Sequence, residues 1–177
     1  MLSRDQVRSG VSMADDISFR IIAIKKPDEV HVVLGHSHCI RTVEDLCQAV
    51  TRSVPGVRFG LAFCEASKGG LVRGEGTDEE LKALARENAL AIGAGHSFIL
   101  LHQDFSSLSV LTAVKNIPEV CTVYCATAKP VEVIIAETGQ GRGIMGIIDG
   151  ASPRDMEGPD DVQERLERLS RLGYKGE

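Results

Sequence analysis

The chain has 177 residues, of which 43% are hydrophobic and 25% are charged, and its formal net charge at pH 7 is −5. This composition is typical of a globular protein, and the length suffices for one well-packed core. The acidic balance argues against a protein that neutralises many nucleic-acid phosphates. Because no apolar run reaches roughly 18 residues, a membrane span is not expected either.

The chain begins with a polar segment that lacks the apolar core of a secretory signal. We expect residues 1–14 to be a disordered leader and residues 15–177 to form a single domain. The five cysteines are an odd number and have apolar neighbours. We therefore expect the cysteines to be reduced thiols and the protein to be cytoplasmic.

Strands and helices are expected in an alternating order after this leader. Alternating apolar residues and flanking turn residues predict strands at 17–25, 29–35, 57–66, 71–73, 96–102, 119–127, 131–138 and 143–149. Apolar residues at helical spacing predict helices from Thr42 to Pro55, from Thr77 to residue 92, at about 107–116 and at 160–172. The predicted fold class is α/β, with a mixed sheet flanked by helices in one compact domain.

Helix ends and faces can also be predicted. Thr42 is the expected N-cap of the first helix, and Thr77 with Glu80 forms the capping-box pattern of the second. In the last helix Val162, Leu166 and Leu169 are expected to face inward, with Glu164/Arg168 and Glu167/Arg171 paired outside.

The segment 88–98, NALAIGAGHSF, carries the clearest candidate for chemistry. A helix runs into Gly93, the chain passes Gly95, and His96 opens an apolar strand. Glycines permit a left-handed cap and a close approach of another group to the backbone. A neutral imidazole at such a strand edge can act as a nucleophile or base. The alternative is a histidine whose ring is bonded to a backbone carbonyl.

Other polar residues can likewise be interpreted either as functional or as ordinary structural residues. Glu65 continues the register of an apolar strand face, so it either needs a partner or lies in solvent beyond the strand end. His36 and His38 share a strand face and are followed by Cys39. A metal site there is disfavoured, because the sequence lacks the paired second half of a zinc site.

The segment 139–146, GQGRGIMG, contains a G-x-G-x-x-G pattern. A dinucleotide fingerprint would open a helix here, whereas the sequence continues as a strand. The segment is either a flexible hairpin tip or a turn whose amides and Arg142 bind a phosphate. Lys115 and Asn116 have the ordinary interpretation of a solvated helix end.

Several long blocks then identify a family. They are TVEDL (42–46), SVPGVRFGLAFCEAS (53–67), NALAIGAGHSF (88–98), AVKNIPEVCTVY (113–124) and PVEVIIAETGQGRGIMGIIDG (130–150). In this order they closely resemble the archaeal and bacterial adenosine-specific kinase family over roughly residues 15–150. The resemblance implies an α/β fold, a homo-oligomer that is expected to be a trimer, binding of adenosine or AMP, and a phosphohistidine.

The resemblance also implies roles for single residues. It makes His96 the phosphoacceptor candidate and Glu65 a candidate for contact with the ribose or the imidazole. The remaining ligand or phosphate candidates are Arg73, Arg142, Lys115, Asn116 and His38. The chain departs from the family pattern at Cys39 and Cys47, where aromatic residues are expected, and at Lys129, where asparagine is expected.

Three functions follow as alternatives. The first is phosphoryl transfer to or from adenosine through a phosphohistidine, the second is a non-catalytic adenosine or AMP sensor, and the third is a structural homo-oligomer. A Walker A motif, a set of kinase loops and a Mg²⁺-type aspartate cluster are all missing from the sequence. We therefore assign no cofactor, keep Mg²⁺ as the one alternative, and assign no metal-binding residues.

Overall fold

The computed structural model describes residues 17–67, 69–103 and 107–174. The expected leader at residues 1–14 lies outside the described residues. The strands are β1 (Ser18–Ala23), β2 (His31–Ser37), β3 (Phe59–Cys64), β4 (Val72–Gly76), β5 (Ser97–His102), β6 (Val120–Thr127), β7 (Val131–Glu137) and β8 (Arg142–Asp149). The helices are α1 (Thr42–Ser53), α2 (Glu79–Ile92), α3 (Leu108–Lys115) and α4 (Pro159–Arg171). The predicted α/β class is confirmed, with the strands divided between two sheets.

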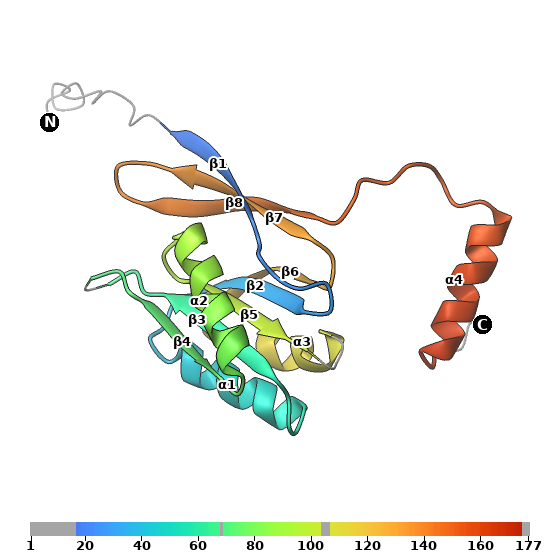
Figure 1. The fold of residues 1–177 in the computed structure, drawn as a ribbon, viewed down its shortest axis with the longest axis horizontal. Coiled ribbons are helices and arrows are strands. Elements are labelled where there is room, and N and C mark those ends of the chain that lie inside the picture. Colours follow the sequence, from blue (N-terminus) through green and yellow to red (C-terminus); the bar gives the residue numbers. More distant parts are fainter. Residues whose placement is uncertain (1–16, 68, 104–106, 175–177) are drawn as a thin grey trace, which may run out of the picture.

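The larger sheet has the order β4-β3-β5-β2-β6, and its neighbouring strands are antiparallel. Its central strands β3 and β5 are buried along their whole length, because both faces of the sheet are covered. Figure 1 shows α1 and α3 on one side, and α2 with the smaller sheet β1-β7-β8 on the other. Alternate residues of β3 therefore enter two cores, Phe63 toward α1 and α3, and Ala62 toward α2.

Helix α2 packs directly on β3. A Cβ added at Gly60 would lie 2.1 Å from the backbone carbon of Leu81, so only glycine allows this approach. Asp78 caps the helix, since its side chain accepts a hydrogen bond from the Leu81 amide. The predicted Thr77 cap is wrong by one residue, because the Thr77 hydroxyl donates to the Val57 carbonyl instead.

The first helix also begins differently from the prediction. Arg41 holds the N-cap position of α1 and makes no capping hydrogen bond through its side chain. Thr42 is the first helical residue, and its buried hydroxyl lies 2.6 Å from the Ser37 hydroxyl and donates to the Cys39 carbonyl. Thr42 thus ties the start of α1 to the end of β2.

The smaller sheet contains the glycine-rich segment. β7 and β8 form an antiparallel hairpin, and the backbones of Thr138 and Gly141 exchange hydrogen bonds across its tip. The prediction that this segment continues as a strand is confirmed. Val131, Val133 and Ile135 of β7 enter the core against α2, whereas no described element covers the opposite face of the sheet.

Helix α4 stands apart from the rest of the fold. Figure 1 shows it at the end of an extended segment that leaves β8. None of its residues is buried, so the expected inward packing of Val162, Leu166 and Leu169 is not seen within this chain. The expected outer pairs of the helix are also absent from the described ion pairs, where Arg165 pairs instead with Glu157. The stripe is apolar, but none of the described residues of the body of the fold covers it.

Candidate functional site

His96 lies in a strained turn between α2 and β5. Gly93 ends α2 in the left-handed conformation with φ of 62°, and His96 has the same φ of 62°. Among the described residues, His96 is the sole non-glycine residue with positive φ. Such a conformation is uncommon for histidine and persists where the surroundings enforce it. It marks His96 as a candidate for function.

The surroundings fix this turn through the backbone. The His96 amide donates to the Cys64 carbonyl at 2.7 Å, and its carbonyl accepts from the Ser37 amide at 2.9 Å. At Gly95 an added Cβ would lie 2.9 Å from the Ala66 Cβ. The turn is thus held against the ends of β2 and β3, and His96 lies next to Cys64, the residue before Glu65.

The half-buried imidazole of His96 contacts two rings. The Phe63 ring stacks on it with centroids 6.1 Å apart, and the His36 ring meets it edge-on, also at 6.1 Å. Burial lowers the pKa of His36, and the neighbouring His96 and His38 lower it further. The neutral form of His36 is therefore favoured beside His96. Its contact with His96 was missed in the sequence, because strand pairing and not spacing brings the two rings together.

Glu65 has a cationic partner in Arg73. Glu65 follows β3 and Arg73 lies on the adjacent β4, and Arg73 Nη1 is 3.2 Å from Glu65 Oε1. Arg73 also pairs with Glu44 of α1 and donates to the Ile40 carbonyl. Burial opposes the charge of Arg73, but its bonds to Glu65 and Glu44 outweigh that effect and raise its pKa. Of the two interpretations of Glu65, the paired carboxylate is the correct one.

Arg142 approaches the same turn from the smaller sheet. It begins β8, pairs with Glu137 at 3.2 Å, and donates to the Ala91 carbonyl near the end of α2. A backbone bridge joins it to Ala94, and an added Cβ at Gly93 would lie 2.9 Å from its Nη1 atom. The turn before His96 and the glycine-rich hairpin are therefore in direct contact.

A groove of about 700 Å³ lies at this contact. It is lined by Ala66, Gly93, Gly95, Ala136, Thr138, Gln140, Gly141, Arg142 and Gly143. Ala66 and Gly95 are the chain neighbours of Glu65 and His96, so the groove connects the end of the larger sheet to Arg142. Backbone amides of glycine-rich turns and a guanidinium are the groups that bind phosphate oxygens.

The other predicted residues lie in separate places. His38 is exposed, and its Nδ1 atom is 3.1 Å from the Glu119 carbonyl and 3.6 Å from Cys121 Sγ. Lys115 lines a small hollow of about 320 Å³ with residues 120–123. Within the described residues, no hydrogen bond or ion pair joins Lys115 or His38 to His96.

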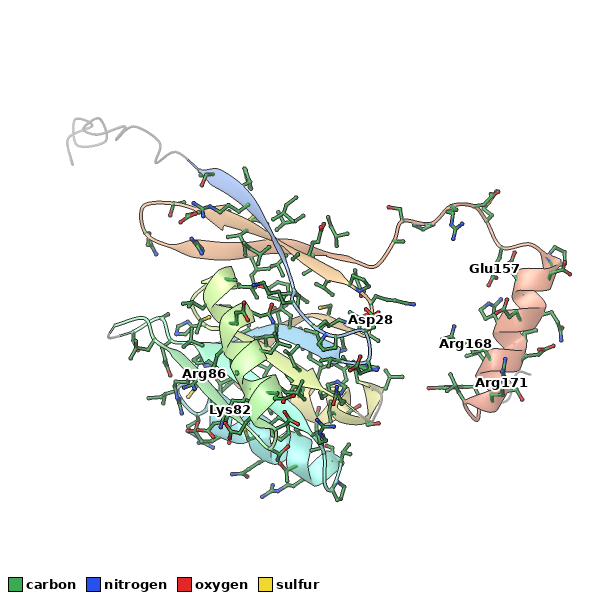
Figure 2. The ribbon with its side chains drawn as sticks, viewed as in Figure 1. Asp28, Lys82, Arg86, Glu157, Arg168 and Arg171 are labelled. Carbon is green, nitrogen blue, oxygen red and sulfur yellow. The ribbon has the colours of Figure 1, made fainter. Side chains whose placement is uncertain are left out.

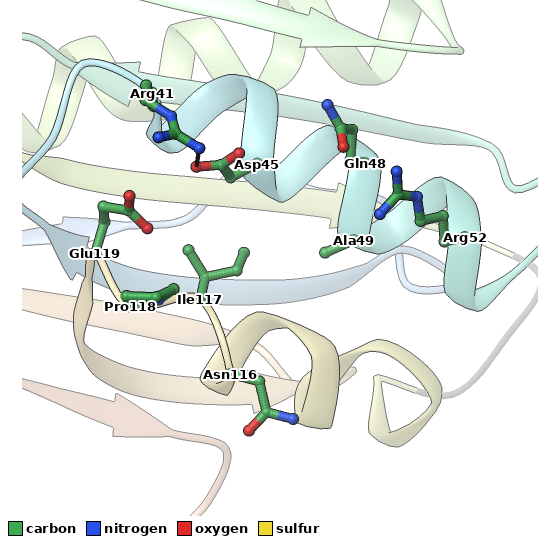
Figure 3. Close-up of a pocket in the computed structure, with 9 residues that line it drawn as sticks. All are labelled: Arg41, Asp45, Gln48, Ala49, Arg52, Asn116, Ile117, Pro118 and Glu119. Carbon is green, nitrogen blue, oxygen red and sulfur yellow. Dashed lines mark ion pairs between the residues drawn. The ribbon is translucent and has the colours of Figure 1, made fainter.

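Asn116 lines a different hollow, of about 400 Å³, between α1 and the connection from α3 to β6. Figure 3 shows Asn116 and Glu119 on one side of it and Gln48 and the Arg41–Asp45 ion pair on the other. Asn116 is thus placed away from the groove beside His96. The structure brings Glu65, Arg73, His96 and Arg142 to one end of the fold, but not Asn116 or Lys115.

The described residues contain no group of three or more His, Cys, Asp or Glu side chains arranged to hold a metal ion. Nor does that part of the chain include a helix long and apolar enough to cross a membrane. All five cysteines are free thiols.

The chain is thus an α/β protein in which the turn that holds His96 and a groove lined by Arg142 lie at one end of a sheet. The model of the family described as adenosine specific kinase matches residues 22–175, and the chain belongs to this family. Among solved structures, the PH1918 protein from Pyrococcus horikoshii OT3 is similar with a TM-score of 0.87 and 40% sequence identity. The alignment covers 92% of this chain and all of that one. No curated protein matches the chain.

Proposed function

We propose that the protein binds adenosine or AMP in the groove between the His96 turn and Arg142. The observation that carries this proposal is the contact between the two glycine-containing turns, which places Arg142 beside the approach to His96. Arg142 and the amides of the hairpin supply donors for one phosphate group. Membership of the adenosine-specific kinase family supports adenosine as the nucleoside.

We further propose that a phosphoryl group moves between the nucleotide and His96. In one direction an imidazole nitrogen of His96 attacks the phosphorus of AMP, the N–P bond forms, and the P–O5′ bond breaks. The proton that the other imidazole nitrogen loses ends on the 5′ oxygen of the leaving adenosine, and Glu65 is the group proposed to carry it. Arg142 neutralises charge on the phosphoryl oxygens. The reverse reaction transfers the group to adenosine.

Arg73 has a supporting role in this scheme. Its guanidinium is held by Glu65 and Glu44, so a phosphate that reached it would compete with two carboxylates. We propose that Arg73 orients Glu65 and that Arg142 is the principal phosphate ligand. His38, Lys115 and Asn116 are proposed only as outer contacts, since within the described part of the chain no hydrogen bond or ion pair links them to the lining of the groove.

The test is the intact mass of purified protein incubated with AMP, with AMP and adenosine binding measured in parallel by calorimetry. Binding together with an acid-labile gain of one phosphoryl group supports the transfer. Binding without any gain supports the second candidate, a non-catalytic sensor. The pairing of Arg73 with Glu65 and Glu44 favours this candidate, because it leaves that guanidinium less free to bind a phosphoryl group. Absence of binding to either compound contradicts both candidates.

We also propose that the protein is a cytoplasmic homotrimer. The free thiols support a reducing compartment. The uncovered face of the smaller sheet supports association of chains. Light scattering at micromolar concentration tests the assembly, and the mass of a single chain would contradict it.

A further inference from the structure

Helix α4 has the pattern of a helix that packs on a partner surface. Val162, Leu166 and Leu169 lie at helical spacing on one stripe, while most of the remaining positions carry charged residues. A 13-residue helix without tertiary packing is marginal in water. In Figure 2 the side chains of Arg168 and Arg171 have no side chain from the body of the fold beside them. The helix therefore lacks the surface that its stripe requires.

The outer face of the smaller sheet is an equally unpartnered apolar surface. Phe19 and Ile21 of β1 are 67% and 62% exposed. The strand register places Ile21 beside Ile134 of β7. At the other end of this face Ile148 of β8, which is 44% exposed, pairs with Glu132. A contiguous apolar face of this kind marks an interaction site in a monomer.

The two surfaces match in length and in charge. The helix is about 20 Å long, and the seven-residue strand β7 extends about 23 Å. Glu132 lies beside Ile148 on this face of the sheet, and Arg168 neighbours Leu169 on the helix. Neither of these two charged side chains has an ion-pair partner among the described residues.

We propose that α4 of one copy packs its Val162–Leu166–Leu169 stripe on the outer face of the β1-β7-β8 sheet of a second copy. Each chain carries both surfaces, and the segment 150–158 carries the helix away from its own sheet, so exchange between copies satisfies both surfaces (Figure 1). Such a contact is heterologous and forms a ring when the rotation closes. The inference rests on the proposed homo-oligomer and identifies its interface; it is independent of the nucleotide chemistry.

Two single substitutions in the full-length chain test the interface. Leu166→Asp places a charge in the helix stripe, and Ile21→Asp places one on the sheet face. Because neither side chain belongs to the buried core, both variants should keep the cooperative urea unfolding of the wild type, and any loss of helical circular dichroism should not exceed the contribution of α4. Light scattering should show at least a twofold lower mass for each. Glu164→Ala, on the opposite face of α4, is the matched control and should keep the wild-type mass.

Mixing the two variants distinguishes exchange from docking of α4 on its own sheet. An Ile21→Asp chain retains an intact helix and a Leu166→Asp chain retains an intact sheet face, so the mixture should contain a complex heavier than either variant alone. Unchanged mass in either variant overturns the proposal, and so does a loss of mass that mixing does not reverse. A single-chain mass for the wild type would instead refute the oligomer itself, and nucleotide binding enters none of these readouts.

Discussion

The backbone amide of His96 donates to the carbonyl of Cys64 at 2.7 Å, and this bond joins the α2–β5 turn to the end of β3. Because Glu65 follows Cys64, the bond also places His96 beside the strand end that carries the Glu65–Arg73 pair. On the other side Gly93 contacts Arg142. One short turn thus connects a candidate nucleophile, a carboxylate and a candidate phosphate ligand.

AMP should bind more tightly than ATP. The groove offers one arginine, Arg142, and a glycine-rich hairpin, and the sequence contains no triphosphate-binding loop. A preference of about tenfold, or roughly 1.4 kcal/mol, is expected. Titration calorimetry with AMP, adenosine and ATP measures it. Tighter binding of ATP than of AMP would refute the single-phosphate site.

Arg142→Ala should weaken AMP binding by about ten- to a hundredfold while changing adenosine binding little, because a charge-assisted hydrogen bond contributes roughly 1.5–3 kcal/mol. Arg20→Ala is the matched control, since Arg20 also pairs with Glu137 but does not line the groove. Equal losses for AMP and adenosine would show that Arg142 does not contact the phosphate.

Gly60→Ala should destabilise the fold by about 1–3 kcal/mol or more, because its Cβ would meet the α2 backbone at Leu81. Gly143→Ala serves as the control, since an added Cβ there meets nothing within 4 Å. Urea unfolding followed by circular dichroism compares the two midpoints. Similar midpoints would contradict the described packing of α2 on β3.

Stability should fall as the pH drops from about 6.5 toward 4. Burial lowers the pKa of His102 from 6.5 to about 4, and the nearby His31 adds to this effect. In that interval the unfolded chain binds a proton that the folded chain does not, so unfolding becomes easier as the pH falls. Urea midpoints at pH 7.5 and 4.5 measure the loss. His102→Gln should reduce the difference, and an unchanged difference would exclude His102 as its source.

Much of the fold was predictable from the sequence, because the period of apolar residues reports which residues face a core. All eight strands and four helices were expected near their observed positions. The helix starts at Thr42 and Thr77 were misplaced by one residue, since hydroxyls at strand ends can bond to carbonyls instead of capping. The exposure of α4 was not predictable, because an apolar stripe does not reveal whether the surface that covers it belongs to the same chain.

The candidate site was predictable only in part. The glycines around His96 and the register of Glu65 are local signals that single out residues. The partners of these residues depend on strand order: β4 brings Arg73 to Glu65, and β2 brings His36 to His96. Local spacing instead suggested pairing His36 with His38 on one strand face.

The most direct test of the account is the location of the phosphoryl group after incubation with AMP. Wild type, His96→Ala, His36→Ala and His38→Ala are compared by intact mass before and after mild acid. We predict an acid-labile phosphoryl group on the wild type and on His38→Ala, and none on His96→Ala, whose oligomer stays folded. A label that persists in His96→Ala and disappears in His38→Ala would contradict the central claim and place the chemistry at residues 36–38.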